Sequence, residues 1–461
     1  MAKPQHYEKG LFVFHRDLRI EDNVGLLQAC AQCERVYTCF IFTPEQIGVR
    51  NTYRSKRAIR FMCESLADLS RSIREHGGKL LFLYGDTTAV CRQLVRDLGI
   101  SAIFTNKDYT PYATERDKRL SEMCESQHIG YVESADYYLY EPGSVRTTTG
   151  KYYQKFTPFY DAVLRRPVAH PATARVKHLA GTSTLTGKET TLAEILEKMG
   201  QPDTTTPPFA VGGRANGLAR LRASQSGYGQ GRDMLTYETT GLSAYLKFGC
   251  VSVREAYHSF CDRYGRPSEI VRQLIWRDFY AHVLYGFPGV LSGYTYKHVA
   301  WRASRRDFER WKRGETGFPV VDACMRQLNQ TGYMHNRGRM IVANFLVKTL
   351  LIKWKWGEEY FAKQLIDYDP ASNNGNWQAI SATGVDQKPY FRDMNPWIQS
   401  AKFDPEAEYI HKWVPELAGV PAKELHKWDT WHSDPKHKGL DYPNPMVDYS
   451  AQKVKMLDMY K

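Results

Sequence analysis

The first third of the chain alternates short apolar runs with segments that have the period of a helix. After Tyr53, apolar side chains recur every three or four positions, as at Leu66, Leu69 and Ile73. The apolar runs between such segments have the length of buried strands; they are Leu11–His15, Val36–Phe42, Lys79–Tyr84 and Ala102–Thr105. Strands and helices that alternate at this spacing predict a Rossmann-like, doubly wound parallel sheet.

The junction between the first strand and the next helix contains no glycine. It reads HRDLRIEDN, whereas a dinucleotide pyrophosphate needs small residues here for close approach to the backbone. The junction therefore argues against NAD binding by this half of the protein. We interpret its charged residues, Arg16, Asp17, Arg19 and Asp22, as interlocking salt bridges with a structural role.

Two different kinds of sequence follow the strand–helix pattern. Residues 141–225 include TSTLTGKETT and QPDTTTPPFAVGG, which are rich in Thr, Pro and Gly, as in a surface connection. From about Leu242 onward, nearly every segment is helical and rich in aromatic residues. We therefore predict an α/β domain at 1–140, a linker at 141–225 and an all-α domain at 226–461.

Composition limits the location and the partners of the protein. The chain has no long apolar run, and its start, MAKPQHYEKG, lacks the apolar region of a secretory signal; we expect an intracellular protein, in cytoplasm or nucleus, with no membrane contact. The nine cysteines are an odd number without zinc spacing, which favours reduced thiols and no metal site. The net charge of +13 is compatible with nucleic acid as a partner.

The stretch from Gly332 to Arg392 concentrates polar groups among apolar segments. It contains an Arg-rich helical segment, two carboxylates one residue apart, paired asparagines and tryptophans. Buried polar groups are tolerated only where something hydrogen-bonds them. The stretch therefore predicts a binding site for a large, polar, aromatic ligand.

Seven motifs occur in one order along the chain: HRDLRIEDN, FTPFY, TTGLSAYLKFG, IWRDFY, TGYMHNRGRM, NNGNW and PYFR. In this order they resemble the photolyase/cryptochrome family, and most closely its cyclobutane pyrimidine dimer DNA photolyases, from Leu11 to about Tyr449. The resemblance implies an α/β antenna domain and a helical domain that binds flavin adenine dinucleotide (FAD). It also implies a monomeric carbon–carbon lyase that repairs UV-damaged DNA by light-driven electron transfer from reduced FAD.

The resemblance assigns FAD binding to two sets of residues. Ser and Thr side chains before a helix either cap it or bind an anion; in the family this loop holds the FAD phosphates. The second set surrounds the flavin ring and includes the pair Arg339 and Asp367, for which a plain buried salt bridge is the alternative. The implied cofactor-binding residues are Tyr228, Thr239, Thr240, Gly241, Leu242, Ser243, Asn336, Arg339, Asp367, Tyr368, Asp369 and Asn373.

Asn373 matches the residue that faces N5 of the flavin. A neutral amide can donate to the deprotonated nitrogen or accept from its protonated form, and the sequence leaves both alternatives open. Plant cryptochromes have aspartate at the matching position. Asparagine therefore favours repair over signalling.

Three tryptophans match the family's electron-transfer chain. For any one of them alone, packing in the core is the simpler interpretation. The resemblance implies that Trp377 reduces the flavin, Trp354 refills Trp377, and Trp311 ends the chain near solvent.

The implied lesion pocket departs from the family pattern at two positions. Trp276 matches an aromatic residue that stacks on the flipped-out dimer, and Met340 matches a methionine typical of dimer photolyases. Gln273 stands where these enzymes usually have glutamate, and Ala379 where they usually have a second tryptophan. The alanine is expected to open the pocket and to remove a stacking contact, which is worth about 1–3 kcal/mol per base.

Further residues match positions that grip the DNA backbone beside the lesion. A solvated surface charge is the alternative for any single arginine. Together with the basic composition, they predict an electrostatic grip that is independent of base sequence. These residues are Arg232, Arg277, Arg337, Arg392 and Gln399.

The antenna and a signalling role stay open. FTNKDYTPY and Lys297 fall where a folate or deazaflavin antenna is contacted, but they do not select one type. The main alternative function is a blue-light cryptochrome that signals through a protein partner; Asn373 and Met340 disfavour it, while Gln273 and Ala379 keep it open. A DNA-binding scaffold without flavin is a third hypothesis, which a colourless purified protein would support.

Overall fold

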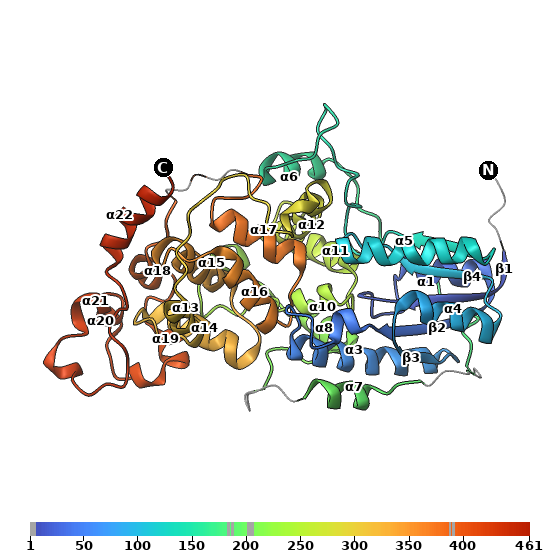
Figure 1. Ribbon diagram of the computed structural model, residues 1–461, viewed down its shortest axis with the longest axis horizontal. Helices are drawn as coiled ribbons and strands as arrows, with labels where there is room; N and C mark the ends of the chain where they lie inside the picture. The colour runs from blue at the N-terminus through green and yellow to red at the C-terminus, as the bar shows by residue number, and fades with distance from the viewer. Residues whose placement is uncertain (1–5, 182–184, 186–188, 201–206, 387–388, 390–391) are drawn as a thin grey trace. The chain divides into compact units, whose positions relative to one another are not determined.

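Figure 1 shows the computed structural model, which describes residues 6–181, 185, 189–200, 207–386, 389 and 392–461. Parts of the predicted linker and two positions of the PYFR motif therefore lie outside the described residues. By its internal packing the chain divides into two compact units. The first comprises Met1–Asp203, Ala210–Ser224 and Thr240–Pro288, and the second Thr204–Phe209, Gln225–Thr239 and Gly289–Lys461.

The centre of the first unit is a parallel sheet with five strands among the described residues. They are β1 (Tyr7–Phe14), β2 (Cys33–Phe42), β3 (Leu80–Tyr84), β4 (Ala102–Asn106) and β5 (Gly130–Ser134), in the order β3-β2-β1-β4-β5. Leu11 of β1 pairs with Tyr37 of β2 on one side and with Ile103 of β4 on the other. The predicted doubly wound parallel sheet is confirmed. β5 was not predicted, because its sequence GYVES is half polar and only partly buried.

Helices cover the sheet and continue the first unit. α3 runs along one side of the sheet and α5 along the other (Figure 1). Ser55 caps the N-terminus of α3 by accepting from the N–H of Ala58, and the predicted apolar face, with Leu66, Leu69 and Ile73, is buried. The helices are α1 (Val24–Gln32), α2 (Pro44–Ile47), α3 (Lys56–Glu75), α4 (Thr87–Leu98), α5 (Pro111–Ser126), α6 (Phe156–Leu164), α7 (Leu192–Met199), α8 (Arg214–Arg222), α10 (Ser243–Lys247), α11 (Val253–Tyr264) and α12 (Glu269–Gly286).

Four charged residues of HRDLRIEDN are buried, namely Arg16, Asp17, Arg19 and Asp22, and their ion pairs reach residues distant in sequence. Arg16 pairs with Asp108 at 2.8 Å. Asp17 accepts from the side-chain amide of Asn106 at 2.6 Å, and burial raises the pKa of Asp17 to about 6. The structural interpretation of these charges holds, but their partners come from other segments of the first unit, which the motif alone does not show.

Arg19 and Asp22 of this motif belong to a buried network with two arginines and two aspartates. Arg19 pairs with Asp136 at 2.7 Å, and Arg254 of α11 pairs with Asp22 at 2.9 Å and with Asp136 at 2.7 Å. Burial alone would raise the pKa of Asp136, but Arg19 and Arg254 lower it overall. The network therefore ties α11 to the loop after β1.

The second unit is helical and encloses an aromatic-rich core. Its core includes Trp311, Phe318, Phe345 and Trp428, all nearly inaccessible to solvent. In the described part of the chain, none of the helices combines the length and apolar character that a membrane span requires. The elements are α9 (Tyr228–Gly231), η1 (Pro288–Val290, at the boundary), α13 (Arg305–Arg313), α14 (Pro319–Thr331), α15 (Asn336–Asn344), η2 (Phe345–Thr349, a π-helix), α16 (Trp354–Gln364), α17 (Pro370–Ile380), α18 (Pro396–Phe403), α19 (Glu408–Trp413), η3 (Pro415–Leu417), α20 (Ala422–Leu425), α21 (Trp428–Trp431), η4 (Pro435–His437) and α22 (Tyr449–Met459).

Candidate functional site

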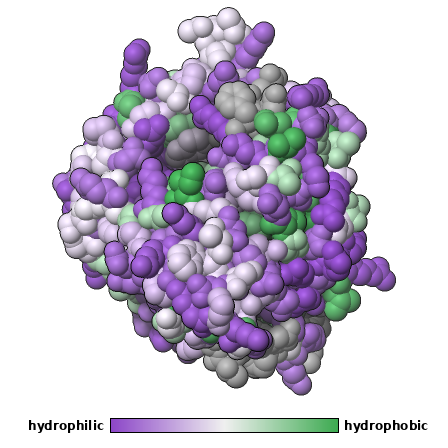
Figure 2. Space-filling view, turned by 90° about the vertical axis from the view of Figure 1, so that its left-hand side faces the viewer, coloured by the Kyte–Doolittle hydropathy of each residue, from purple (hydrophilic) through white to green (hydrophobic). Residues whose placement is uncertain are grey.

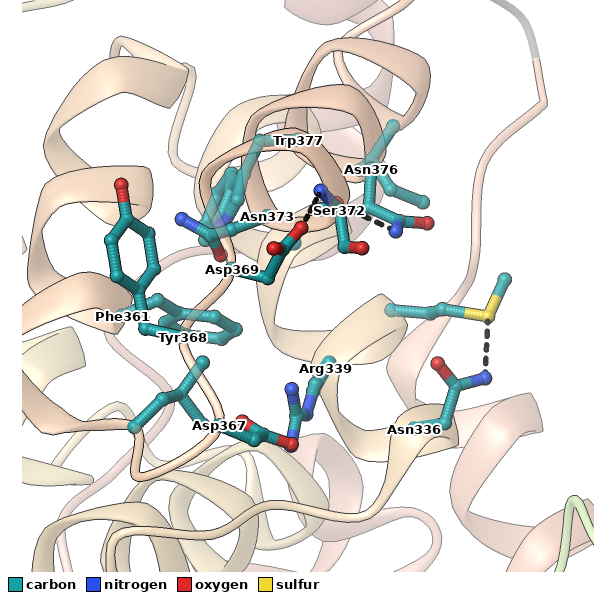
Figure 3. Close-up of a pocket in the computed structure, with 14 residues that line it drawn as sticks. Asn336, Arg339, Phe361, Asp367, Tyr368, Asp369, Ser372, Asn373, Asn376 and Trp377 are labelled. Carbon is teal, nitrogen blue, oxygen red and sulfur yellow. Dashed lines mark hydrogen bonds and ion pairs between the residues drawn. The ribbon is translucent and has the colours of Figure 1, made fainter. Parts of the chain in front are cut away.

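A pocket in the second unit lies between α15, α16, α17 and the connection that precedes α17 (Figure 3). Eight of its lining residues were singled out from the sequence: Asn336, Arg339, Met340, Asp367, Tyr368, Asp369, Asn373 and Trp377. Six were missed: Ala343, Phe361, Leu365, Ser372, Asn376 and Ile380. Helical spacing could have found three of these six, because Ser372, Asn376 and Ile380 lie on the same face of α17 as Asn373 and Trp377.

Arg339 and Asp367 form an ion pair at the edge of the pocket. Nη2 of Arg339 lies 2.8 Å from Oδ2 of Asp367, and Nε of Arg339 donates to the carbonyl oxygen of Met334 at 2.8 Å. Burial alone would lower the pKa of Arg339, but the Asp367 carboxylate raises it above its usual range. The second oxygen of Asp367, Oδ1, is buried and has no hydrogen-bond partner among the described residues. This oxygen can accept a hydrogen bond from an N–H group of a ligand.

Asp369 begins the helix that forms one wall of the pocket. Its Oδ1 accepts from the N–H of Ser372 at 2.9 Å and caps α17. A carboxylate at this position also interacts favourably with the positive end of the helix dipole. Asp369 therefore sets where α17 starts and so where Asn373 faces the pocket.

The side-chain amide of Asn373 has a fixed orientation. Its Nδ2 donates to the backbone oxygen of Glu358 at 3.1 Å and to Oε1 of Glu358 at 3.2 Å. Glu358 is fully buried and pairs with Lys355 at 3.0 Å. Because two acceptors flank the amide nitrogen, the other end of the group is the carbonyl oxygen. Of the two alternatives that the sequence left open, the geometry favours the one in which Asn373 accepts a hydrogen bond from the ligand.

The walls of the pocket are aromatic. Phe361, Tyr368 and Trp377 line it, and Trp377 packs directly on α16, where a Cβ built on Gly357 would lie 2.2 Å from Cη2 of Trp377. A flat ring system with N–H and carbonyl groups suits aromatic walls, the open acceptors of Asp367 and Asn373 and the cation of Arg339. These residues fit the flavin ring of FAD.

The structure contradicts the predicted position of Trp311. Trp311 is completely buried, its Nε1 donates to the carbonyl oxygen of Val342 at 3.1 Å, and its ring centroid lies 6.3 Å from that of Trp377. The expectation that Trp311 lies near solvent is wrong, because Phe308 and Trp311 share the inward face of the otherwise charged α13. Trp354 is also buried, at 2% exposure.

Trp301 is a half-buried tryptophan that the sequence reasoning missed. It packs against the core of the second unit, and its neighbour Arg302 donates its N–H to the carbonyl oxygen of Leu351 at 2.8 Å. This backbone bond places Trp301 beside the segment that leads into Trp354. The available signal was its surroundings: VAWRASRR is polar, whereas Trp311 follows Phe308 at helical spacing.

The predicted phosphate-binding loop is divided between the two units. Tyr228 and Thr239 belong to the second unit, where the hydroxyls of Thr239 and Tyr333 lie 3.3 Å apart. Thr240, Gly241, Leu242 and Ser243 belong to the first unit and lead into α10. The Thr240 hydroxyl accepts from the N–H of Leu242 at 3.3 Å, so it stabilises the turn that precedes α10 and does not cap the helix.

Three predicted DNA- or lesion-binding residues lie on α12, in the first unit. Gln273 donates from Nε2 to the carbonyl oxygen of Glu269 at 3.1 Å. Trp276 stacks on Phe156, with ring centroids 3.6 Å apart and an angle of 5° between the rings. Arg277 donates to a backbone oxygen at 2.6 Å, which anchors α12 within the first unit.

The remaining predicted contacts lie in the second unit, some of them outside the pocket. Arg337 pairs with Asp233 at 2.6 Å, and the neighbouring Arg232 lies 3.7 Å from the same carboxylate. Ala379 is 9% exposed and is not among the residues that line the described pocket. The expectation that alanine at this position opens the lesion pocket concerns a different site and stays a prediction. Arg392 is exposed and Gln399 is half-buried.

Comparison with known proteins places both halves of the chain in one family. Residues 11–176 match the family model for DNA photolyase, and residues 270–461 match that for the FAD binding domain of DNA photolyase. A deoxyribodipyrimidine photo-lyase of Escherichia coli (strain K12) is 35% identical over 97% of this chain and 97% of its own.

Two solved structures extend this comparison. An archaeal photolyase from Sulfolobus tokodaii with two FAD molecules has a TM-score of 0.85 and 38% identity, and covers 98% of this chain and 99% of its own. A cryptochrome of Synechocystis sp. PCC6803 has a TM-score of 0.88 and 26% identity, and covers 99% of this chain and 100% of its own. The chain belongs to the FAD-dependent DNA photolyase family.

Proposed function

We propose that this protein is a light-driven carbon–carbon lyase that repairs cyclobutane pyrimidine dimers in DNA. The observation that carries the proposal is the pocket of the second unit, where Asp367 and Asn373 present acceptors between aromatic walls. This pocket occurs in a chain that matches deoxyribodipyrimidine photo-lyases over nearly its whole length. When bound, reduced FAD supplies the light-driven electron transfer.

The pocket residues orient the cofactor in this proposal. Asp367, held by Arg339, accepts an N–H of the flavin ring, and Asn373 accepts a second one through its carbonyl oxygen. Asn336, Tyr368 and Asp369 complete the contacts. The loop residues Tyr228, Thr239, Thr240, Gly241, Leu242 and Ser243 bind the phosphates.

The electron route to the surface ends at Trp301 in the revised proposal. Trp377 lines the pocket, Trp354 follows it, and half-buried Trp301 replaces Trp311 as the residue that meets solvent. Trp301→Phe should therefore slow photoreduction of the oxidised flavin at least tenfold, since each lost donor breaks the route, and should leave repair by chemically reduced enzyme unchanged. Trp311→Phe is the matched control. If photoreduction is slow in Trp311→Phe and normal in Trp301→Phe, Trp311 is the terminal donor.

DNA binding uses the basic residues of both units. Arg232, Arg277, Arg337, Arg392 and Gln399 hold the backbone of UV-damaged DNA. The dimer is flipped out of the duplex, a step that costs less for a damaged base pair.

The flipped dimer meets a second group of residues in this proposal. Gln273, Met340 and Ala379 lie around it, and Trp276 stacks on it. Because Phe156 covers one face of Trp276, the dimer stacks on the opposite face.

Several further assignments are part of the same proposal. The protein works as a monomer inside the cell, where DNA is found, and its domains are 1–140, 141–225 and 226–461. On the face shown in Figure 2, hydrophilic residues predominate and hydrophobic ones form small separate groups, as suits a charged partner better than a protein interface. An antenna chromophore, folate or deazaflavin, is contacted by residues of FTNKDYTPY and by Lys297.

A cryptochrome that signals through a protein partner is the alternative. The similar fold of the Synechocystis cryptochrome does not separate the two functions, so catalysis must. Anaerobically photoreduced protein is illuminated with one oligonucleotide that carries a cyclobutane dimer and another that carries a (6-4) lesion, and restored bases are measured by chromatography. Repair of the first oligonucleotide alone supports the proposal; repair of neither one favours signalling.

A further inference from the structure

The backbone around Arg392 is held by side chains from distant parts of the second unit. The ammonium group of Lys348 donates to the carbonyl oxygen of Arg392. The hydroxyl of Tyr449 donates to the carboxylate of the next residue, Asp393. Burial raises the pKa of Tyr449, so this hydroxyl stays protonated and acts as the donor. Two successive residues are thus tied to η2 and to α22.

A third bond holds the following residue. The N–H of Met394 donates to Oδ1 of Asn344 at 3.1 Å. Asn344, which is 1% exposed, ends α15, and Lys348, which is 4% exposed, lies in the π-helix η2 that follows directly. α22 packs against this π-helix. We call Asn344, Lys348 and Tyr449 the anchor residues.

Stability alone does not explain the anchor residues, because burying polar groups costs free energy. A buried ammonium group loses hydration, and π-helical turns are rare and frequent at functional sites. Oδ1 of Asp393 is buried without a hydrogen-bond partner among the described residues. Arg392 itself is exposed. Buried polar groups thus fix the backbone of a residue that remains accessible to solvent.

The held segment continues into a helix with another predicted DNA contact. Asn395 caps α18 by accepting from the N–H of Trp397 at 2.9 Å. Gln399 follows one turn later, and its Oε1 is buried without a partner in the described part of the chain. The three bonds at residues 392–394 therefore determine where α18 starts as well as the path of the backbone at Arg392.

We propose that the anchor residues are positioning residues for DNA binding, which hold Arg392 ready for a phosphate group. The proposal rests on the proposed function, in which Arg392 contacts the DNA backbone. An arginine whose backbone is already ordered loses less conformational freedom on binding, so the contact is stronger. Because Tyr449 belongs to α22, the last helix of the chain contributes to DNA affinity without touching DNA.

The test is a double-mutant cycle between Tyr449→Phe and Arg392→Ala. DNA affinity is measured by fluorescence anisotropy on duplexes with and without a dimer, over a series of salt concentrations. Arg392→Ala should weaken binding on the order of tenfold and reduce the salt slope by about one unit. Tyr449→Phe should weaken binding on the order of threefold to tenfold, equally on both duplexes, and should lower the slope in the same direction. In the Arg392→Ala background it should have no further effect.

Tyr442→Phe is the matched control. The Tyr442 hydroxyl donates to buried Asp322 at 2.5 Å in the same unit, so this variant also removes a tyrosine–aspartate bond. It should lower the melting temperature and leave the salt slope of the wild type unchanged. If Tyr449→Phe does not fold, the cycle is run with Lys348→Met, which keeps a long side chain and removes the donor.

The outcomes separate this proposal from the proposed function. Independent, multiplicative losses in the double variant, or wild-type binding by Tyr449→Phe, would overturn the positioning role while Arg392 kept its phosphate contact. A wild-type salt slope in Arg392→Ala would overturn both the contact and its anchoring. Failure of the wild type to repair a dimer would overturn the lyase assignment alone, because the binding cycle does not depend on repair.

Discussion

Two buried aspartates that pair with arginine show how a structural carboxylate differs from a binding one. Asp136 in the first unit uses both oxygens: Oδ1 accepts from Arg254 and Arg19, and Oδ2 from Arg19. Asp367 in the second unit pairs through Oδ2 with Arg339, while its Oδ1 is buried without a partner in the described residues. The first carboxylate is saturated by the protein, and the second keeps an acceptor for a ligand. The burial of an ion pair does not by itself reveal a site; an unused oxygen on a residue that lines a pocket does.

The largest expected effect tests the saturated carboxylate. Asp136→Asn removes the charge that Arg19 and Arg254 share; Arg254 keeps its ion pair with Asp22, whereas buried Arg19 loses its ion pair with Asp136. Loss of one partner of a buried pair costs about 3–5 kcal/mol. The free energy of unfolding, measured in urea, should fall by that amount. Loss of less than about 1 kcal/mol would show that the network is not a structural unit.

Replacing the pocket carboxylate should affect cofactor binding much more than stability. Asp367→Asn should weaken FAD binding by about 2–3 kcal/mol, because the charged acceptor and the partner of Arg339 are lost together. Unfolding of the protein without FAD should change much less than in Asp136→Asn. Titration of that protein with FAD, followed by flavin fluorescence, measures the affinity. Equal losses of stability in the two variants would remove the distinction drawn between the two aspartates.

A third buried aspartate, Asp278, adds a test that depends on pH and concerns stability alone. Asp278 of α12 is also fully buried; its Oδ1 has no hydrogen-bond partner among the described residues, although Arg277 lies 3.9 Å away, and burial raises the pKa of Asp278 to about 7. The folded state therefore holds this proton more tightly than the unfolded chain. That stabilising contribution is complete below pH 4 and is lost as the pH rises through about 7.

Asp278→Asn should remove this dependence. At pH 8 the variant should be more stable than the wild type, and at pH 4, where Asp278 is protonated in the folded state and about half protonated in the unfolded chain, the difference should nearly vanish. Thermal melts of both proteins at the two pH values measure the difference in stability. FAD affinity should not change, because Asp278 does not line the described pocket. Equal stabilisation at both pH values would show that Asp278 titrates outside this range.

The sequence predicted elements whose signal is local. The strand runs and the amphipathic α3 follow from apolar periodicity, and these are confirmed. β5 was missed because its half-exposed residues carry no apolar run. The partners of Arg19 and Asp22 could not be predicted from HRDLRIEDN, because Asp136 and Arg254 lie far along the chain.

For the site, resemblance supplied most of the polar pocket residues but not the burial of individual tryptophans. A match of residue type did not tell Trp311 from Trp301; the helical spacing of Trp311 from Phe308 was a weak signal, and the packing of the two side chains shows the difference. The orientation of the Asn373 amide was equally inaccessible, since it depends on Glu358 in another helix. Local patterns thus predict elements, whereas the choice among equivalent side chains depends on tertiary contacts.

Gly357 limits how this protein could be engineered for heat resistance. Replacing a helical glycine with alanine usually stabilises a helix by about 1 kcal/mol. On α16 the new methyl group would occupy the space of Trp377, only 2.2 Å from its ring. A consensus-style stabilising library would propose this change and damage the pocket wall. Position 357 should therefore be excluded from such libraries.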